Sequence, residues 1–140
     1  MKPSPRPAPS SAATTAEFAH TTVLIIDDDP TYRFLLRGLC TKLGIGVIEE
    51  ADDGARGLEA AQRLNPDMIL LDIMMPGING IEVCRALRAQ PETANTAILI
   101  QTGAASESER MEGFNAGATD VLTKPLNLAE FTVRVQIGRA

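Results

Sequence analysis

Short apolar runs at four places in the chain each end in polar residues that could do chemistry. These residues are Asp27 and Asp28, Asp72, Thr102 and Lys124. Clustered carboxylates repel one another unless a cation joins them, and hard oxygen ligands suit Mg²⁺. A carboxylate beside such an ion can attack a phosphoryl group, while a hydroxyl and an ammonium stabilise the incoming oxygens. If the fold brings these residues together, their chemistry would be phosphoryl transfer to an aspartate.

The segments between these residues have the pattern of a parallel sheet with crossover helices. From Thr22 onward, short apolar runs alternate with longer helical segments, which indicates an α/β fold. The predicted strands are 23–26, 45–49, 68–71, 98–101 and 121–123. The predicted helices are 30–43, 54–64, 81–89, one opening at Ser106 with a capping box to Glu109, and one capped by Asn127. The carboxyl ends of the strands then share one edge, where open α/β sheets bind ligands.

Apolar stripes predict which side of each helix is buried. In the first helix the stripe comprises Leu35, Leu36, Leu39, Cys40 and Leu43. In the last helix it comprises Leu128, Phe131 and Val135. Val133 and Ile137 lie outside that stripe, either as scattered surface residues or as a contact for a dimer or an effector.

Each candidate residue also has a plainer explanation. Asp72 alone would be a turn residue, Thr102 a buried hydroxyl and Lys124 a surface charge, and only their shared sheet edge favours a site. Asp29 is best explained as a helix cap, because Pro30 suits the first helical position.

Other acidic residues serve as contrasts to the candidates. Asp52 and Asp53 are predicted to be turn and cap residues before the second helix, although they lie at the same edge as the candidates and could affect its electrostatic potential. Asp67 and Asp120 precede their strands, so we expect both at the opposite edge of the sheet, away from the site.

Composition narrows the class of protein. The 140 residues include 13 Lys plus Arg and 18 Asp plus Glu, which gives a net charge of -5. This balance argues against direct binding of nucleic acid or an anionic membrane, since either needs a basic surface. No apolar run has the length of a membrane span. Two cysteines and one histidine supply neither a disulfide scaffold nor a zinc site, which predicts reduced thiols in a cytoplasmic protein.

The first 20 residues differ from the rest. They are rich in Pro, Ala and Ser and hold few apolar side chains to offset the entropy of ordering them. We expect residues 1–20 to be a flexible leader, with a proline-rich docking segment as the alternative, and residues 21–140 to form one folded domain.

Four motifs in register give the chain a family resemblance. The segments LIIDDDP, LLDIMMPGING, ILIQTG and DVLTKP follow in this order. Through them, residues from about 22 to 140 resemble the receiver domain of two-component response regulators. The resemblance implies a flavodoxin-like (βα)5 α/β fold, a doubly wound parallel five-stranded sheet with strand order 2-1-3-4-5.

The resemblance also implies a role for each site residue. Asp72 matches the phosphoacceptor, Asp28 a direct ligand of Mg²⁺ or Mn²⁺, and Asp27 a carboxylate that helps to hold the ion. The backbone carbonyl of Met74 matches a third protein ligand, and Asp72 itself belongs to the metal site.

Two further residues complete the implied site. Thr102 matches the hydroxyl that moves to the phosphoryl group, and Lys124 the ammonium that pairs with it. The resemblance implies a cis peptide between Lys124 and Pro125. Two positions depart from the family pattern: Val121 replaces a common aromatic residue, and Leu126 follows Lys-Pro where Phe is frequent. We therefore expect loop and helix displacement rather than an aromatic rotamer switch.

The implied partners are a histidine kinase or a histidine phosphotransfer protein as donor and a downstream effector protein or domain. The effector, or a second copy of the chain in a homodimer, would bind the surface formed by the fourth helix, fifth strand and fifth helix. The chain would be a regulatory domain rather than an enzyme, catalysing only its own phosphorylation and a slow dephosphorylation. Slow loss is expected because Met74 and Ala104 offer no group to orient an attacking water.

Three other functions can be compared with a stand-alone receiver. The chain could be a receiver fragment of a larger regulator or hybrid kinase. An aspartyl-phosphate phosphatase would carry a second aspartate two residues after the nucleophile, where this chain has Met74. A nucleotide switch would need a glycine-rich phosphate loop, and the first strand is instead followed by acidic residues.

Overall fold

A computed structural model describes residues 17–103 and 106–139, with residues 137–139 described by their backbone alone. The strands are β1 (Thr22–Ile26), β2 (Val47–Ala51), β3 (Met68–Asp72), β4 (Ala97–Thr102) and β5 (Asp120–Thr123). The α-helices are α2 (Pro30–Lys42), α3 (Gly54–Leu64), α4 (Gly80–Arg88), α5 (Glu107–Asn115) and α6 (Leu128–Arg139). A short 3₁₀ helix, η1 (Pro91–Thr93), precedes β4.

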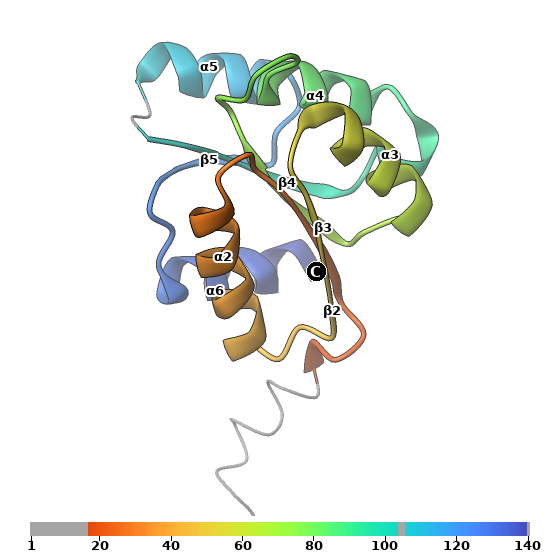
Figure 1. Ribbon diagram of the computed structural model, residues 1–140, viewed down its shortest axis with the longest axis vertical. Coiled ribbons are helices and arrows are strands. Elements are labelled where there is room, and N and C mark those ends of the chain that lie inside the picture. Colours follow the sequence, from red (N-terminus) through yellow and green to blue (C-terminus); the bar gives the residue numbers. More distant parts are fainter. Residues whose placement is uncertain (1–16, 104–105, 140) are drawn as a thin grey trace, which may run out of the picture.

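The five strands form one parallel sheet with helices on both faces. Its order is β2-β1-β3-β4-β5, which confirms the predicted topology. Figure 1 shows α2 and α6 on one face, and α3, α4 and α5 on the other. The three central strands are buried along nearly their whole length, as their continuous apolar sequences predict, whereas β2 lies at an exposed edge.

Aspartate side chains cap the amino termini of α2 and α3 at the carboxyl edge of the sheet. Asp29 accepts a hydrogen bond from the backbone N–H of Thr31 at the start of α2, with Pro30 in the first helical position. Asp53 accepts from Arg56 N at the start of α3. These contacts confirm the capping roles predicted for both aspartates, and they place the helix amino termini beside the strand ends.

The second strand begins two residues later than predicted. The chain from Gly44 to Gly46 is held as a loop, because Gly44 has a φ of 81° and Ile45 N–H donates to the carbonyl of Cys40. Ile45 is buried within that loop, and strand pairing starts with Val47 opposite Thr22. The apolar pattern therefore identified a buried residue but assigned it to the wrong element.

The predicted inward stripes are partly wrong. Leu36, Cys40 and Leu43 are buried as predicted, but Leu35 is 41% exposed, and the buried side of α2 also carries Tyr32. In α6, Phe131 and Val135 are buried as predicted, whereas Leu128 at the first turn is partly exposed.

The positions outside the α6 stripe have different outcomes. Val133 is exposed, as its place outside the stripe predicted. The Ile137 side chain lies outside the described part of the structure.

The folded part of the chain extends into the predicted leader. Phe18 is fully buried against the α2/α6 face, and its carbonyl accepts hydrogen bonds from the backbone N–H groups of Thr21 and Gly46. Burial of this aromatic side chain favours an ordered segment, and the surrounding polar composition hid that signal. The rest of the proposed leader, residues 1–16, falls outside the described residues. Among the helices described, none is long and apolar enough to cross a membrane.

Candidate functional site

The structure brings the predicted acidic residues together at the carboxyl edge of the sheet. Asp27 follows β1 and Asp72 ends β3, and carboxylate oxygens of Asp27, Asp28 and Asp72 all lie within 4.8 Å of one another. Asp27 is 1% exposed and Asp72 is 5% exposed, whereas Asp28 faces solvent. Three carboxylates so close together, two of them buried, form an arrangement that a cation would stabilise.

Backbone contacts fix the buried carboxylate of Asp27. Its Oδ1 accepts a hydrogen bond of 2.9 Å from Asp29 N, and its backbone N–H donates to the carbonyl of Ala51 in β2. The guanidinium of Arg33 donates to the Asp27 carbonyl at 2.7 Å. The end of β1 is therefore held by both of its neighbouring elements before any ligand arrives.

Lys124 is the positive charge of the site. Its Nζ lies 3.1 Å from Oδ2 of Asp27 and 3.1 Å from Oδ1 of Asp72. Burial alone would lower the pKa of Lys124, but the hydrogen bonds and charges of the two aspartates outweigh it and raise the pKa above its ordinary value. The ammonium is therefore fully charged at neutral pH. The Lys124–Pro125 peptide is cis, as predicted.

Asp72 is harder to ionise than an ordinary aspartate. Burial, followed by the negative charge of Asp27, raises the pKa of Asp72 to about 6. The charge and hydrogen bond of Lys124 and a hydrogen bond from the Met74 backbone lower this pKa without cancelling the rise. At neutral pH Asp72 is mainly a carboxylate, and its charge is only partly compensated.

The loop after β3 is built around the backbone of Asp72. Gly77 has a φ of 80°, a left-handed conformation that favours glycine. The Gly80 N–H donates to the carbonyl of Ile73, and a Cβ at Gly80 would lie 2.2 Å from the Asp72 carbonyl oxygen. The glycine-rich segment thus lets α4 begin directly beside Asp72. The Met74 side chain is 70% exposed, and its backbone faces the site.

Thr102 lies at the same edge, at the end of β4. It is buried, and its hydroxyl donates a hydrogen bond of 3.0 Å to Oε1 of Glu109 in α5. Ser106 accepts from the backbone N–H of Glu109, as the predicted capping box requires, but the Glu109 carboxylate is engaged with Thr102. The loop position Ala104 lies outside the described residues. A direct contact between α5 and the site edge was not anticipated from the sequence.

Sequence reasoning also missed Tyr32. Its hydroxyl donates to Oε1 of Gln101 at 2.7 Å and accepts from the backbone N–H of Leu126 at 3.0 Å. The Nζ of Lys124 lies 4.4 Å from the centre of the Tyr32 ring. A signal was present, because Gln101 is a polar residue in an otherwise apolar central strand and had to find a buried partner.

The contrast residues lie where the sequence placed them. Asp67 accepts a hydrogen bond from the backbone N–H of Thr22, at the amino-terminal edge of the sheet. Asp120 is the first residue of β5, at the same edge. Asp52 forms an ion pair with Arg56 in the first turn of α3. None of these three belongs to the three-aspartate cluster. A position before a strand accounts for Asp67 and Asp120, whereas Asp52 directly follows β2 at the site edge and is instead paired with Arg56.

The donor set of the cluster suits a hard divalent cation. Three carboxylates supply oxygen ligands, Asp28 leaves one side open to solvent, and the described residues place no histidine or cysteine there. This chemistry matches Mg²⁺ or Mn²⁺, which bind oxygen ligands and retain water. Asp27, Asp28 and Asp72 are the residues that could hold such an ion.

Comparisons with known proteins agree with this geometry. The family model for the response regulator receiver domain matches residues 23–136. The chain is 39% identical over 114 residues to the DNA-binding dual master transcriptional regulator RpaA of Synechocystis sp., a match that covers 81% of this chain and 47% of RpaA. It is 42% identical over 120 residues to the transcriptional regulatory protein ResD of Bacillus subtilis, covering 83% of this chain and 47% of ResD. The chain thus spans about half the length of the curated relatives it matches.

Solved structures give the same result. A response regulator from Chloroflexus aurantiacus superimposes with a TM-score of 0.80 at 33% identity, covering 85% of this chain and 97% of that one. The chemotaxis protein CheY4 of Vibrio cholerae gives a TM-score of 0.79 at 33% identity, covering 85% and 98%. With its fold, its motifs and this match in agreement, the chain belongs to the family of response regulator receiver domains.

Proposed function

We propose that this receiver domain accepts a phosphoryl group on Asp72 from a histidine kinase or a histidine phosphotransfer protein, in a step that depends on Mg²⁺. One observation carries the proposal. The Asp72 carboxylate is buried beside Asp27 and Asp28, and the Lys124 ammonium lies 3.1 Å from it. A nucleophile, oxygen ligands for a metal and a fixed positive charge therefore meet at one point.

Each site residue would have a distinct role in the transfer. A carboxylate oxygen of Asp72 attacks the phosphorus, and the bond to the donor nitrogen breaks with its electron pair returning to the donor imidazole. Lys124 stays protonated and compensates the charge on the transferred group, as its raised pKa allows. Asp27, Asp28, Asp72 and the Met74 carbonyl would hold Mg²⁺, which neutralises negative charge on the phosphoryl oxygens when it is bound.

The proposal is tested by direct phosphorylation. The native chain, incubated with acetyl phosphate and Mg²⁺, should gain one phosphoryl group by intact mass, and Asp72→Asn should gain none. Asp67→Asn is the matched control, because Asp67 lies at the opposite edge and the amide oxygen can still accept from Thr22. Equal uptake by native and Asp72→Asn chains would refute Asp72 as the acceptor.

The metal site can be tested separately. Adding Mg²⁺ should raise the thermal midpoint of the native chain, because an ion that binds only the folded state stabilises it. Asp28→Asn should raise the Mg²⁺ concentration needed for this effect by tenfold or more, because it removes a charged oxygen ligand. The fold should tolerate the change, since Asp28 is exposed. An unchanged Mg²⁺ dependence in Asp28→Asn would contradict its assignment as a ligand.

Output would use the surface formed by α5, β5 and α6. An acyl phosphate brings about two negative charges to the site. Thr102 would then exchange its bond to Glu109 for one to the phosphoryl group, which would free α5 to move. Val121 is fully buried, and a Cβ on Gly113 of α5 would lie 2.6 Å from it, so helix displacement fits this surface better than rotation of an aromatic side chain. A downstream effector or a second copy of the chain would bind there.

The relatives suggest how such an output could continue. RpaA is described as DNA-binding, and this chain covers only 47% of its length. The absence of direct nucleic-acid binding therefore stays a prediction for this chain, and a receiver fragment of a longer regulator stays an alternative. Cys40 and Cys84 are buried free thiols, which is compatible with the cytoplasmic location we propose.

We also propose slow loss of the phosphoryl group. Met74 is exposed beside the site and has no polar group to orient water. Met74→Asn should shorten the lifetime of the phosphorylated chain severalfold, measured as its decay after the donor is removed. Met111→Asn, at another exposed methionine on α5, should leave the lifetime unchanged. An unaltered lifetime in Met74→Asn would show that this position does not limit hydrolysis.

A further inference from the structure

A buried tyrosine joins three parts of the chain beneath the site. Tyr32 lies in the first turn of α2 and is 9% exposed. Its hydroxyl uses both hydrogen-bonding capacities, one toward Gln101 in β4 and one toward Leu126 between β5 and α6. The face of its ring lies against Lys124, with 4.4 Å between Nζ and the ring centre. Tyr32 therefore contacts Lys124 at the site, the end of β4, and the segment between β5 and α6.

The Lys124 ammonium has three partners among the described residues. Asp27 and Asp72 hold it through their carboxylates at 3.1 Å, and the electron-rich ring of Tyr32 supports it from a third direction. A lysine side chain has four rotatable bonds, so its ammonium needs several contacts to stay in one place. A cation beside an aromatic face is attracted by the ring electrons, and the attraction is stronger where water is excluded.

The hydroxyl of Tyr32 fixes the ring itself. Gln101 is 2% exposed and directly precedes Thr102, while Leu126 comes two residues after Lys124. The Lys124 backbone N–H also donates to the Thr102 carbonyl at 2.8 Å. The strand end with the hydroxyl and the loop with the ammonium are thus linked twice, once through the backbone and once through Tyr32.

A purely structural role is the plain alternative. Tyrosine often fills a core with its ring and satisfies its hydroxyl nearby. That role accounts for the bonds to Gln101 and Leu126, but it does not require the ring to face a charged group that belongs to the site. The two roles make different predictions, because a structural tyrosine would affect phosphorylation only through stability.

We propose that Tyr32 is a positioning residue for Lys124, which holds the ammonium at the phosphoryl position and ties it to Gln101 and Leu126. This inference rests on the proposed phosphorylation of Asp72. When negative charge arrives at Asp72 and draws the ammonium toward it, the ring environment changes, and the change reaches β4 and the start of α6. The change would then reach the α2/α6 face through Tyr32.

Variants at Tyr32 separate the ring from the hydroxyl. With acetyl phosphate and Mg²⁺, Tyr32→Leu should lower the maximal rate of phosphoryl uptake about tenfold. Tyr32→Phe keeps the ring and should lose only a fewfold. Leu36→Val is the matched control, because Leu36 is buried one turn along on the same side of α2 and belongs to the apolar core of that face. It should lose stability with an unchanged rate.

Each result decides one claim. Slow uptake in Tyr32→Leu with a native rate in Leu36→Val supports positioning. A native rate in Tyr32→Leu, or equal slowing in both variants, overturns it. If Tyr32→Phe takes up phosphate at the native rate and Tyr32→Leu is slow, the ring alone positions Lys124. The hydrogen bonds of the hydroxyl would then play no part in positioning. Failure of the native chain to take up phosphate would refute the proposed function instead.

An optical measurement tests the inference without a substitution at Tyr32. Tyr32 is the only tyrosine of the chain, which has no tryptophan, so tyrosine emission reports on this ring alone. Beryllofluoride with Mg²⁺, as a stable substitute for the phosphoryl group, should change that emission in the native chain. The same addition should leave Asp67→Asn responding like the native chain and Asp72→Asn without a response. Emission unaltered by beryllofluoride, in a native chain that gains a phosphoryl group from acetyl phosphate by intact mass, would overturn the inference.

Discussion

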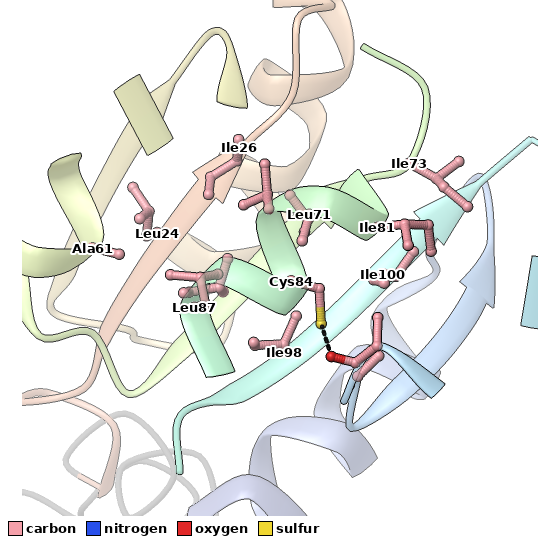
Figure 2. Close-up of a cluster of buried hydrophobic side chains, with 14 of the residues drawn as sticks. Leu24, Ile26, Ala61, Leu71, Ile73, Ile81, Cys84, Leu87, Ile98 and Ile100 are labelled. Carbon is pink, nitrogen blue, oxygen red and sulfur yellow. Dashed lines mark hydrogen bonds between the residues drawn. The ribbon is translucent and has the colours of Figure 1, made fainter. Parts of the chain in front are cut away.

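The two faces of the sheet are packed in different ways. Every buried aromatic side chain lies on the α2/α6 face, namely Phe18, Tyr32 and Phe131. The core under α3, α4 and α5 is aliphatic, with Cys84 reaching the Ala116 carbonyl through its thiol, as Figure 2 shows. On that second face two helices approach the strands through glycines, and a Cβ at Gly57 would lie 2.6 Å from Ile26.

This difference separates two ways of responding to a new charge. A face packed through glycines against β-branched side chains has no space for a side chain to rotate, so a signal must displace a helix. A face with a hydrogen-bonded aromatic side chain can respond by exchanging bonds around it. Both faces meet the sheet edge at which Asp72 lies.

The largest expected effect comes from placing an aromatic residue on the glycine-packed face. Val121→Phe should cost about 3 kcal/mol of unfolding free energy, because Gly113 of α5 leaves no room beside Val121. Leu122→Phe is the neighbouring control, since Leu122 points to the α2/α6 face, and it should cost about 1 kcal/mol. Urea unfolding measures both. Equal costs would show that the two faces have similar room.

The second effect concerns the edge between the faces. Because the pKa of Asp72 is raised from 3.8 to about 6, the folded state holds its proton more tightly than the unfolded state. The corresponding stability is present below pH 4 and lost as the pH rises through 6. Asp72→Asn resembles the protonated form, so it should be more stable than the native chain by about 2 kcal/mol at pH 7.5 in EDTA.

The pH dependence provides the control for this variant. At pH 4 the native Asp72 is protonated, so the advantage of Asp72→Asn should largely disappear. A gain of the same size at both pH values would place its origin in packing rather than in charge.

The smallest effect tests the contact between α5 and the edge. Glu109→Ala removes the acceptor of the Thr102 hydroxyl and should cost about 1 kcal/mol, the usual value of one partly buried hydrogen bond. Glu112→Ala makes the same change of charge at an exposed position of the same helix and should cost less than half as much. Thermal unfolding compares the two. If both variants unfold alike, the bond does not hold α5 in place.

Strand ends could be predicted well because short apolar strands alternate with longer helical segments along the chain. Continuous apolar runs gave β1, β3 and β4, and the polar residue after each run gave the edge that holds Asp27, Asp72 and Thr102. Asp29 was assigned as a cap from its place before Pro30, a purely local relation that the structure confirms.

Long-range polar contacts could not be predicted in the same way. The bond from Tyr32 to Gln101 spans 69 positions, and the one from Thr102 to Glu109 competes with a local capping box. Periodicity also failed at Leu35, because the side of a helix that is buried depends on which strand lies beneath it.

The burial of Phe18 has a consequence for where this chain can be cut. The family match begins at residue 23, and the composition of the chain suggests a boundary at residue 20. A shortened chain that began at Thr21 would keep every motif and still lose about 3 to 5 kcal/mol, as a buried phenylalanine does when it is truncated. Shared sequence motifs mark what a domain does, while the limits of its stable unit are set by which side chains close its core.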